Sequence, residues 1–253
     1  MPLEAPYRKL TINMEHITDG FPEVGIEYMQ PTEFFDFDQD AVRSFASKVI
    51  EEAPDAKEKA IKLFYAVRDS IRYDPYSISL EPAPYKASSV LAAGRGYCLP
   101  KANLLIACAR SVGIPAGIGL SDVYNHLCTE RLRRMMGGRE LFLHHGYAVM
   151  HIDNKWVKAA PAFNIELCDK FDVLPTEFDG ENDALFQPYD AKGRRHMEYD
   201  ADHGIWSDFP LDRVATDFSA YYPSSIYDAE ARAAVDAEIK SEQKSFEDEK
   251  PLV

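Results

Sequence analysis

The sequence predicts an α+β fold, because helical patterns and an antiparallel hairpin pattern occupy different parts of the chain. Apolar residues recur at helical spacing over about 56–71 and again over about 98–112. A strand pattern over about 143–160 is interrupted only by Asp153-Asn154, a two-residue turn signal of a β-hairpin. Helices and strands that are separated in this way are typical of α+β domains, whereas strict alternation would favour a parallel sheet.

The first half of the chain is predicted to begin irregularly and then to become helical. Residues 1–37 are expected to form short strands and loops, followed by a helix over about 40–52. Asp55, with Glu58 three residues later, resembles a capping box and predicts the start of the next helix. A Pro-rich loop and a short helix over about 87–92 then lead to a cysteine that follows two glycines.

The second half of the chain is predicted to contain the strands. One strand is expected over about 116–123, whereas residues 125–140, with arginines around a Gly-Gly pair, are expected to be an irregular excursion. After the hairpin, residues 165–225 show no clear period and are predicted to be mostly irregular. A charged helix is expected from about Tyr227 onward.

Composition and charge indicate a globular protein and disfavour binding to nucleic acid or to an anionic membrane. The 253-residue chain has 46% hydrophobic residues, which fits a globular protein, and a net charge of −14. An acidic chain is a poor partner for nucleic acid or an anionic membrane, since neutralising phosphates needs a basic surface. Because no signal-peptide pattern and no long apolar run are visible, we expect a soluble cytoplasmic protein.

The four cysteines are predicted to be reduced thiols with different roles. Cys108 lies mid-helix, and the spacing of the four fits no small disulfide scaffold. Cys98 follows a Gly-x-Gly turn and begins a helix, so it meets unpaired N–H groups and the positive end of the helix dipole. Both favour the nucleophilic thiolate, and we predict that Cys98 is catalytic rather than a small buried apolar residue. Cys128 and Cys168 carry no such signal.

A base for the thiol is sought among the histidines. The candidates are His126, His144, His145 and His151. Alternation along the predicted strand places His145 and His144 on opposite faces. If the hairpin register continues, His145 faces Ala162. Its diagonal neighbours are then Ala160 and Asn164, of which only Asn164 is polar and could orient the imidazole.

Neither a metal site nor a cofactor is predicted. His126-Leu127-Cys128 and the adjacent His144-His145 offer suitable ligand types, but the chain has no paired C-x-x-C or H-x-x-x-H spacing. The arginines within 125–140 could bind a carboxylate or a phosphate. A solvated loop paired with the many acids of the chain is the simpler interpretation.

Three blocks of sequence stand out together. They are Ile71-Arg72-Tyr73-Asp74 with Ala87-Ser88-Ser89-Val90-Leu91; Gly94-Arg95-Gly96-Tyr97-Cys98 with Ala102-Asn103-Leu104-Leu105 and Gly113-Ile114-Pro115-Ala116; and His145-Gly146-Tyr147 with Asn154-Lys155-Trp156-Val157 and Pro161. In this order and spacing, the blocks resemble the transglutaminase-like superfamily, which includes bacterial proteins described as candidate cysteine proteases. The resemblance covers about residues 56–165, and the second block is the most specific.

The resemblance implies a papain/transglutaminase-like core, in which a cysteine-bearing helix packs on an antiparallel sheet that carries His and Asp. It also implies that Cys98 is the nucleophile and that His145 is its general base. The family's third residue is an Asp just before the Pro of the second hairpin strand, and here Ala160 stands in that position. Papain-like enzymes use Asn in the orienting role, so we predict that Asn164 takes it.

The expected domain organisation follows from the extent of the resemblance. Residues 1–54 form an N-terminal extension with a helix, and residues 55–165 form the transglutaminase-like catalytic core. Residues 166–253 form a C-terminal extension, mostly irregular with a charged terminal helix, that packs on the same domain.

The resulting hypothesis is a cysteine-dependent acyl-transfer enzyme that hydrolyses an amide or peptide bond through a thioester acyl-enzyme. Transfer to an amine, as in a transglutaminase, uses the same residues and remains an alternative. A catalytically inactive binding module that kept the fold is the other alternative, and Ala160 is the residue that favours it. The expected partner is a peptide or amide substrate, with no nucleic acid and no membrane.

Overall fold

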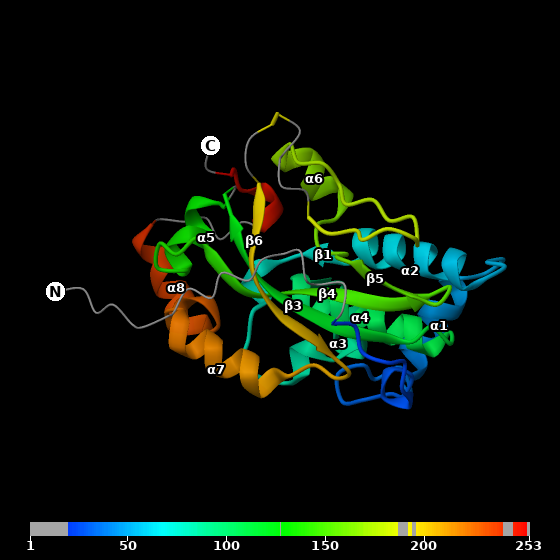
Figure 1. Cartoon of the computed structure of the whole chain (residues 1–253). Helices are drawn as coiled ribbons and strands as arrows, with labels where there is room; N and C mark the ends of the chain where they lie inside the picture. The colour runs from blue at the N-terminus through cyan, green and yellow to red at the C-terminus, as the bar shows by residue number, and fades with distance from the viewer. Residues whose placement is uncertain (1–19, 127, 187–191, 194–195, 240–244, 252–253) are drawn as a thin grey trace.

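The computed structural model of the chain describes residues 20–126, 128–186, 192–193, 196–239 and 245–251. At its centre lies a four-stranded antiparallel sheet in the order β5-β4-β3-β6, and helix α4 packs on it (Figure 1). The strands are β3 (Ala116–Asn125), β4 (Leu141–Ile152), β5 (Lys155–Ala159) and β6 (Met197–Trp206). A short parallel pair, β1 (Arg72–Tyr73) and β2 (Arg95–Gly96), stands just before α4. The predicted α+β fold is confirmed.

Helix α4 (Cys98–Ser111) is surrounded by other elements on all sides. Helices α1 (Asp40–Val49), α2 (Ala56–Ser70) and α3 (Ala87–Ala93) pack against it opposite the sheet (Figure 1). The Asp55 carboxylate caps α2 as predicted, accepting a hydrogen bond from the Glu58 backbone N–H at 2.9 Å. The remaining elements are α5 (Glu130–Met135), α6 (Ile165–Phe171), α7 (Leu211–Tyr221), α8 (Ala229–Glu238) and the 3₁₀ helices η2 (Ile26–Tyr28), η3 (Pro75–Ser77), η4 (Ala83–Tyr85), η5 (Ser224–Ile226) and η6 (Phe246–Asp248).

The β4–β5 hairpin forms with the predicted turn. Ile152 pairs with Lys155, and the two residues between them have positive φ angles, 48° for Asp153 and 64° for Asn154. Two left-handed residues give the turn the twist that the flanking strands require. Asn and Asp tolerate this conformation better than most residues, which is why this turn could be predicted from the sequence.

Alternation along β4 separates two buried faces. Tyr147 and Val149 belong to a small apolar cluster on one face, whereas Ala148 and Met150 join the main core. The alternation is interrupted at His144, whose φ of 54° accompanies a shift in the β3–β4 register. Such a bulge changes the direction in which the neighbouring side chains point.

Two regions predicted to be irregular contain regular elements. Residues 125–140 include α5, which begins where the Thr129 hydroxyl accepts a hydrogen bond from the Leu132 N–H at 3.2 Å. Residues 165–225 include α6, β6 and α7. These short elements are stabilised by tertiary contacts, such as the pairing of β6 with β3, more than by their own periodicity. Near the N-terminus, residues 20–37 form η2 and no strand, while residues 1–19 lie outside the described residues.

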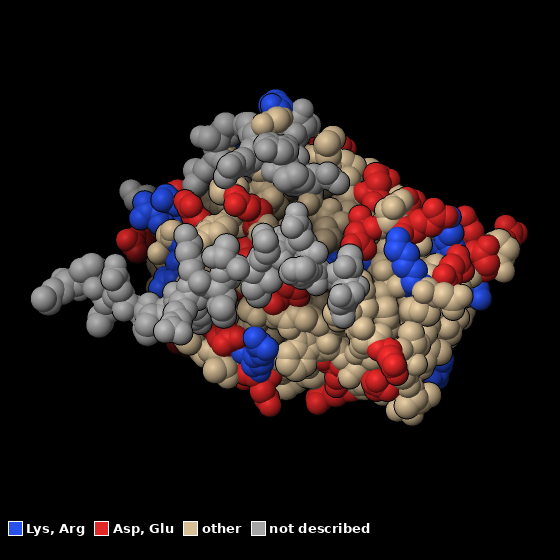
Figure 2. All heavy atoms as spheres, viewed as in Figure 1, with Lys and Arg blue, Asp and Glu red and all other residues tan. Residues whose placement is uncertain are grey.

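One buried apolar cluster extends from Phe34 to Phe246, so the segments before and after the hairpin share a core. All four cysteines are free, as predicted, and all four are buried. Acidic side chains are spread over the face shown in Figure 2, in keeping with the net charge of −14. Within the described ranges, no helix combines the length and apolar character needed to cross a membrane.

Helix α4 carries charged side chains into the core. From Cys98 to Arg110, every residue of this helix is buried. Lys101 Nζ donates hydrogen bonds to the carbonyl oxygens of Arg68 at 2.8 Å and Ile71 at 2.5 Å. Burial lowers the pKa of Lys101 to about 7, because an ammonium group loses hydration in the interior. These bonds tie α4 to the end of α2.

Lys101 is expected to make the stability of the protein depend on pH. Since its pKa is lower in the folded chain than in the unfolded chain, the unfolded state binds more protons between pH 7 and 10.5. The free energy of unfolding of the wild type, relative to Lys101→Met, should therefore rise by about 1.4 kcal/mol per pH unit above pH 7. Urea unfolding at pH 7, 8 and 9 measures this difference.

Lys48→Met provides the control for this prediction, because Lys48 is exposed on α1. Its unfolding free energy should differ from that of the wild type by a constant amount across the same pH range. A Lys101→Met difference that stays flat between pH 7 and 9 would contradict the assigned pKa.

Candidate active site

Cys98 is the first residue of α4, and the chain enters the helix through Tyr97 in an extended conformation with no side-chain cap. The backbone N–H groups of Gly146, Leu99 and Cys98 itself act on the sulfur and favour the thiolate. Burial has the larger effect, since Cys98 is only 9% exposed, and it raises the pKa of the thiol to about 11. The predicted helix-start position is confirmed, but the predicted thiolate is wrong for this conformation, in which desolvation outweighs the helix N-terminus.

His145 lies on β4, directly opposite Ser121 of β3. It is 4% exposed, and its ring centroid lies 4.8 Å from that of Phe186 and 6.0 Å from that of Tyr199. Burial lowers the pKa of His145 to about 3. Its Nε2 atom is buried without a hydrogen-bond partner among the described residues. A neutral imidazole with a free nitrogen is the form that can accept a proton.

Cys98 and His145 line the same cavity. About 40 Å³ of this cavity is open to the centre of a water-sized sphere, enough for a few water molecules at roughly 10–15 Å³ each. Most of its wall is apolar and includes Tyr97, Phe186 and Met197. The structure thus brings the predicted nucleophile and the predicted base to one apolar hollow at the junction of α4 and the sheet.

Gly146 lets β4 approach the start of α4 closely. A Cβ atom built on Gly146 would lie 2.5 Å from Leu99 Cδ2 and 3.2 Å from Leu99 Cα. The same glycine supplies an N–H group that acts on the Cys98 sulfur. Leu99 is fully buried, so it has little room to move away.

Gly146→Ala is therefore expected to push β4 away from α4 and to destabilise the protein by about 1–3 kcal/mol, the usual cost of overpacking. Because Gly146 follows His145, the alkylation rate of Cys98 by iodoacetamide should also change. Gly20→Ala is the control, since a Cβ atom at Gly20 meets nothing within 4 Å. Equal stability of the two variants in chemical denaturation would contradict the close approach.

Asn164 is buried, but its side chain is engaged away from His145. Its Oδ1 accepts a hydrogen bond from the Tyr73 N–H at 3.0 Å, and its Nδ2 donates to Glu166 and Glu247 at 2.9 and 3.2 Å. In the described part of the chain, no hydrogen bond joins the Asn164 side chain to the His145 ring. The orienting role predicted for Asn164 is not supported, and this residue instead joins β1, α6 and η6.

The register explains why that prediction failed. The predicted pairing holds from Ile152↔Lys155 to Ala148↔Ala159, where β5 ends. The Ala160 N–H then donates to the carbonyl oxygen of Ala184 at 2.8 Å, so the chain leaves the β4 ladder before it reaches His145. Ala160 itself is buried in the small cluster with Tyr147. It provides no hydrogen-bonding side chain beside the histidine.

Sequence reasoning missed the aromatic residues that contact His145. Phe186 follows β5 by a long connection, and Tyr199 lies on β6, the strand in the region predicted to be irregular. The Phe186 N–H donates to the Tyr199 hydroxyl at 3.4 Å, which links the two. The abundance of Tyr and Phe in 165–225 was the available signal, but nothing local connected it with a site.

Comparison with known proteins finds a family match for the central part of the chain. Residues 43–161 match the family model of the transglutaminase-like superfamily. The resemblance inferred from the three sequence blocks is thereby confirmed. No curated protein matches the chain.

Two solved structures are similar to parts of the chain. One is a candidate cysteine protease from Cytophaga hutchinsonii, with 17% identity and a TM-score of 0.42, covering 54% of this chain and 41% of that one. The other is a candidate protease from Parabacteroides distasonis, with 17% identity and a TM-score of 0.34, covering 51% of this chain and 26% of that one. The similar region thus spans less than half the length of each of these two solved structures.

Proposed function

We propose that the protein is a cysteine-dependent acyl-transfer enzyme that hydrolyses an amide or peptide bond. The observation that carries this proposal is that Cys98 and His145 line one cavity, with the thiol at the first residue of a helix. The match of residues 43–161 to the transglutaminase-like superfamily gives independent support, since both residues fall within the matched segment.

The proposed reaction begins when Cys98 Sγ attacks the substrate carbonyl carbon while the thiol proton passes to the free nitrogen of His145. The carbonyl oxygen becomes an oxyanion, for which the backbone N–H of Cys98 at the helix start is the proposed donor. Collapse breaks the C–N bond, and His145 returns the proton to the leaving amine. A water molecule, deprotonated by His145, then hydrolyses the thioester and restores the thiol.

The wall of the cavity suggests the kind of acyl group that fits. Tyr97, Phe186 and Met197 give it an apolar lining beside the sulfur. An apolar residue on the acyl side of the scissile bond would bury its surface there without leaving polar groups unpaired. Transfer to an amine instead of water needs no other catalytic residue, so transamidation remains the alternative outcome of the same acyl-enzyme.

One observation favours a second candidate, a binding module without catalysis. Among the described residues, no hydrogen-bonding side chain holds the His145 ring, and the family's Asp position is Ala160. An imidazole that lacks an orienting partner loses part of its catalytic advantage. The retained thiol and imidazole in one cavity weigh against this candidate.

Reaction with p-nitrophenyl esters of apolar acids distinguishes the two candidates. An acyl-transfer enzyme should release a burst of about one p-nitrophenolate per chain, with one acyl group mapped to Cys98 by peptide mass spectrometry. Fluorogenic peptide amides with apolar acyl residues then test amide hydrolysis. Acylation that is absent, or confined to surface lysines, would support the binding module.

A further inference from the structure

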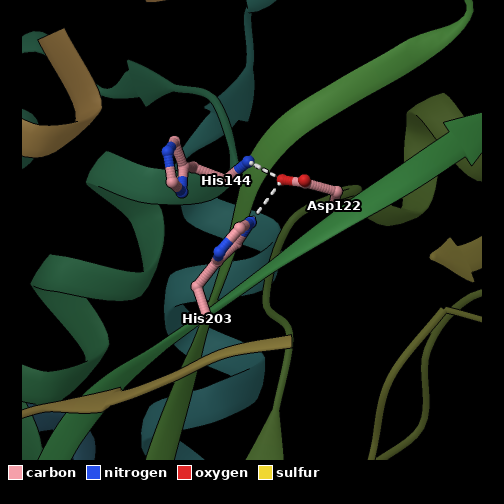
Figure 3. Close-up of side chains that lie close together, drawn as sticks. All are labelled: Asp122, His144 and His203. Atoms are coloured by element: carbon pink, nitrogen blue, oxygen red, sulfur yellow. Dashed lines mark hydrogen bonds and ion pairs between the residues drawn. The ribbon is translucent and has the colours of Figure 1, made fainter. Parts of the chain in front are cut away.

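A second cluster of chemically active side chains lies one residue away from His145, on three neighbouring strands. Asp122 comes from β3, His144 from the bulge of β4, and His203 from β6 (Figure 3). One potential ligand atom from each of these residues lies within 4.8 Å of the others. Because the strand order is β4-β3-β6, the sheet itself gathers these side chains, although they are distant in sequence.

Asp122 is the central member of the cluster. Its Oδ1 accepts a hydrogen bond from the His144 backbone N–H at 2.9 Å and lies 2.9 Å from His203 Nε2 (Figure 3). The contact with His203 has the distance of an ion pair but not the angles of a hydrogen bond, so Nε2 counts as unpartnered. The rings of His144 and His203 lie 4.7 Å apart, centroid to centroid.

His144 is held as a metal-binding histidine would be held. Its Nε2 lies 2.7 Å from Asp217 Oδ2 on α7, which places the ring proton on Nε2 and leaves the lone pair on Nδ1. That Nδ1 atom is buried and has no hydrogen-bond partner in the part of the chain that the structure describes, and the residue is only 1% exposed. A carboxylate that fixes the tautomer of a ligating imidazole is the usual surrounding of histidine in metal sites.

We propose that Asp122, His144 and His203 bind a divalent transition-metal ion, with Zn²⁺ the ion that best fits two imidazoles and one carboxylate. Three protein ligands leave a fourth position of a tetrahedral site for water. The site lies outside the cavity that Cys98 and His145 line, and its existence does not depend on the proposed acyl transfer.

The arrangement needs a small movement to bind the ion. Ligand atoms about 2.0–2.2 Å from a tetrahedral Zn²⁺ are roughly 3.3–3.5 Å from one another. Side-chain movements that shift the ligand atoms by about 1 Å would therefore close the site. Asp122 and Asp217 bring two carboxylates, and Arg213 brings one positive charge. Arg213 Nη2 lies 3.2 Å from His203 Nδ1 and would have to turn away when that nitrogen is protonated. The Arg213 side chain is 44% exposed and is free to do so.

A metal ion in this position would fasten β6 to the centre of the sheet beside the catalytic cavity. Its proposed ligands come from β4, which carries His145, and from the next two strands of the sheet, β3 and β6. His144 directly precedes His145 in the sequence. The ion would therefore hold the bulge of β4 in place. This placement predicts that metal binding raises the melting temperature of the full chain.

Co²⁺ and Zn²⁺ binding to the metal-free full-length protein tests the proposal. Wild type should bind one Co²⁺ per chain, with the visible bands of a four-coordinate site and without the near-ultraviolet band of thiolate ligation. His203→Gln and Asp122→Asn should each weaken binding by about 100-fold or more. Asp217→Asn should weaken it by about 10–100-fold, as loss of a carboxylate behind a ligand does. Circular dichroism confirms that each variant is folded, and Asp122→Asn serves if His203→Gln is not.

His126→Gln is the matched control. His126 is a partly exposed histidine whose Nε2 lies 3.7 Å from Glu198, outside the cluster, so this variant should bind Co²⁺ like the wild type. No saturable binding to the wild type, a thiolate band from the free cysteines, or wild-type affinity in both His203→Gln and Asp122→Asn would each overturn the proposal. These readouts do not involve acylation of Cys98, so failure of the metal site is distinguishable from failure of the proposed activity.

Discussion

Replacing Cys98 with alanine is expected to abolish the burst of p-nitrophenolate and to lower steady-state turnover by at least about 10³-fold. Loss of a nucleophile removes the covalent route altogether, and only the contribution of binding and of the oxyanion site remains. Cys98 is buried, but the substitution removes only its sulfur atom. The free energy of unfolding should therefore change by only about 1 kcal/mol. Burst kinetics and denaturant unfolding of the same preparation measure both effects.

Cys108→Ala is the matched control for this prediction. Cys108 lies on the same helix, is fully buried, and undergoes the same chemical change, but burial alone raises the pKa of its thiol and no N–H group acts on it. The burst should survive in this variant. A burst of unchanged size in Cys98→Ala would show that the acyl group is carried elsewhere and would remove the basis of the proposed function.

The parts of the fold that could be predicted from the sequence have local causes. The Asp55 cap, the helix of Cys98 and the Asp153-Asn154 turn each depend on a few neighbouring residues, and all three form as expected. Alternation along β4 likewise follows from strand geometry. The common cavity of Cys98 and His145, the proposed nucleophile and base, could be predicted because each residue is set in such a local pattern, and because the family's order of motifs links them.

The parts that could not be predicted depend on contacts between distant segments. Asn164 was assigned by extending the hairpin register, but the Ala160 N–H donates to the Ala184 carbonyl instead, and the chain leaves the ladder. Helices α5 and α6 have only 6 and 7 residues, too few to show a strong period. The proposed metal ligands His144 and His203 are far apart in sequence, and the pairing of β3 with both β4 and β6 brings them together.

The protonation state of the Cys98 thiol also could not be predicted from the neighbouring residues in the sequence. A helix start with free N–H groups favours a thiolate, and the N–H groups of Gly146 and Leu99 do act on Cys98. The sequence does not reveal that Cys98 lies in a mostly apolar cavity that it shares with residues of β4, with Tyr97 and with Phe186. Desolvation by this enclosure outweighs the helix terminus, so the proposed mechanism requires a base at the moment of attack. That requirement makes His145 the second decisive residue.

His145→Ala is expected to lower the rate of acylation by about 10²–10⁴-fold, the usual contribution of a general base. Because the thiol would remain in place, residual acylation should still map to Cys98, unlike in Cys98→Ala. Added imidazole should restore part of the rate, since a small base can enter the space that the side chain leaves. A residue that acts only in packing would give no such rescue.

His151→Gln is the control for the His145 prediction, because His151 lies on the same strand but packs edge-on against Trp156, with ring centroids 5.2 Å apart. Its acylation rate should stay within about twofold of the wild type, as expected for a substitution that touches no reacting atom. If His145→Ala acylates Cys98 at the wild-type rate, the base must come from another residue. If the rate falls but imidazole does not restore it, His145 supports the shape of the cavity and not the proton transfer.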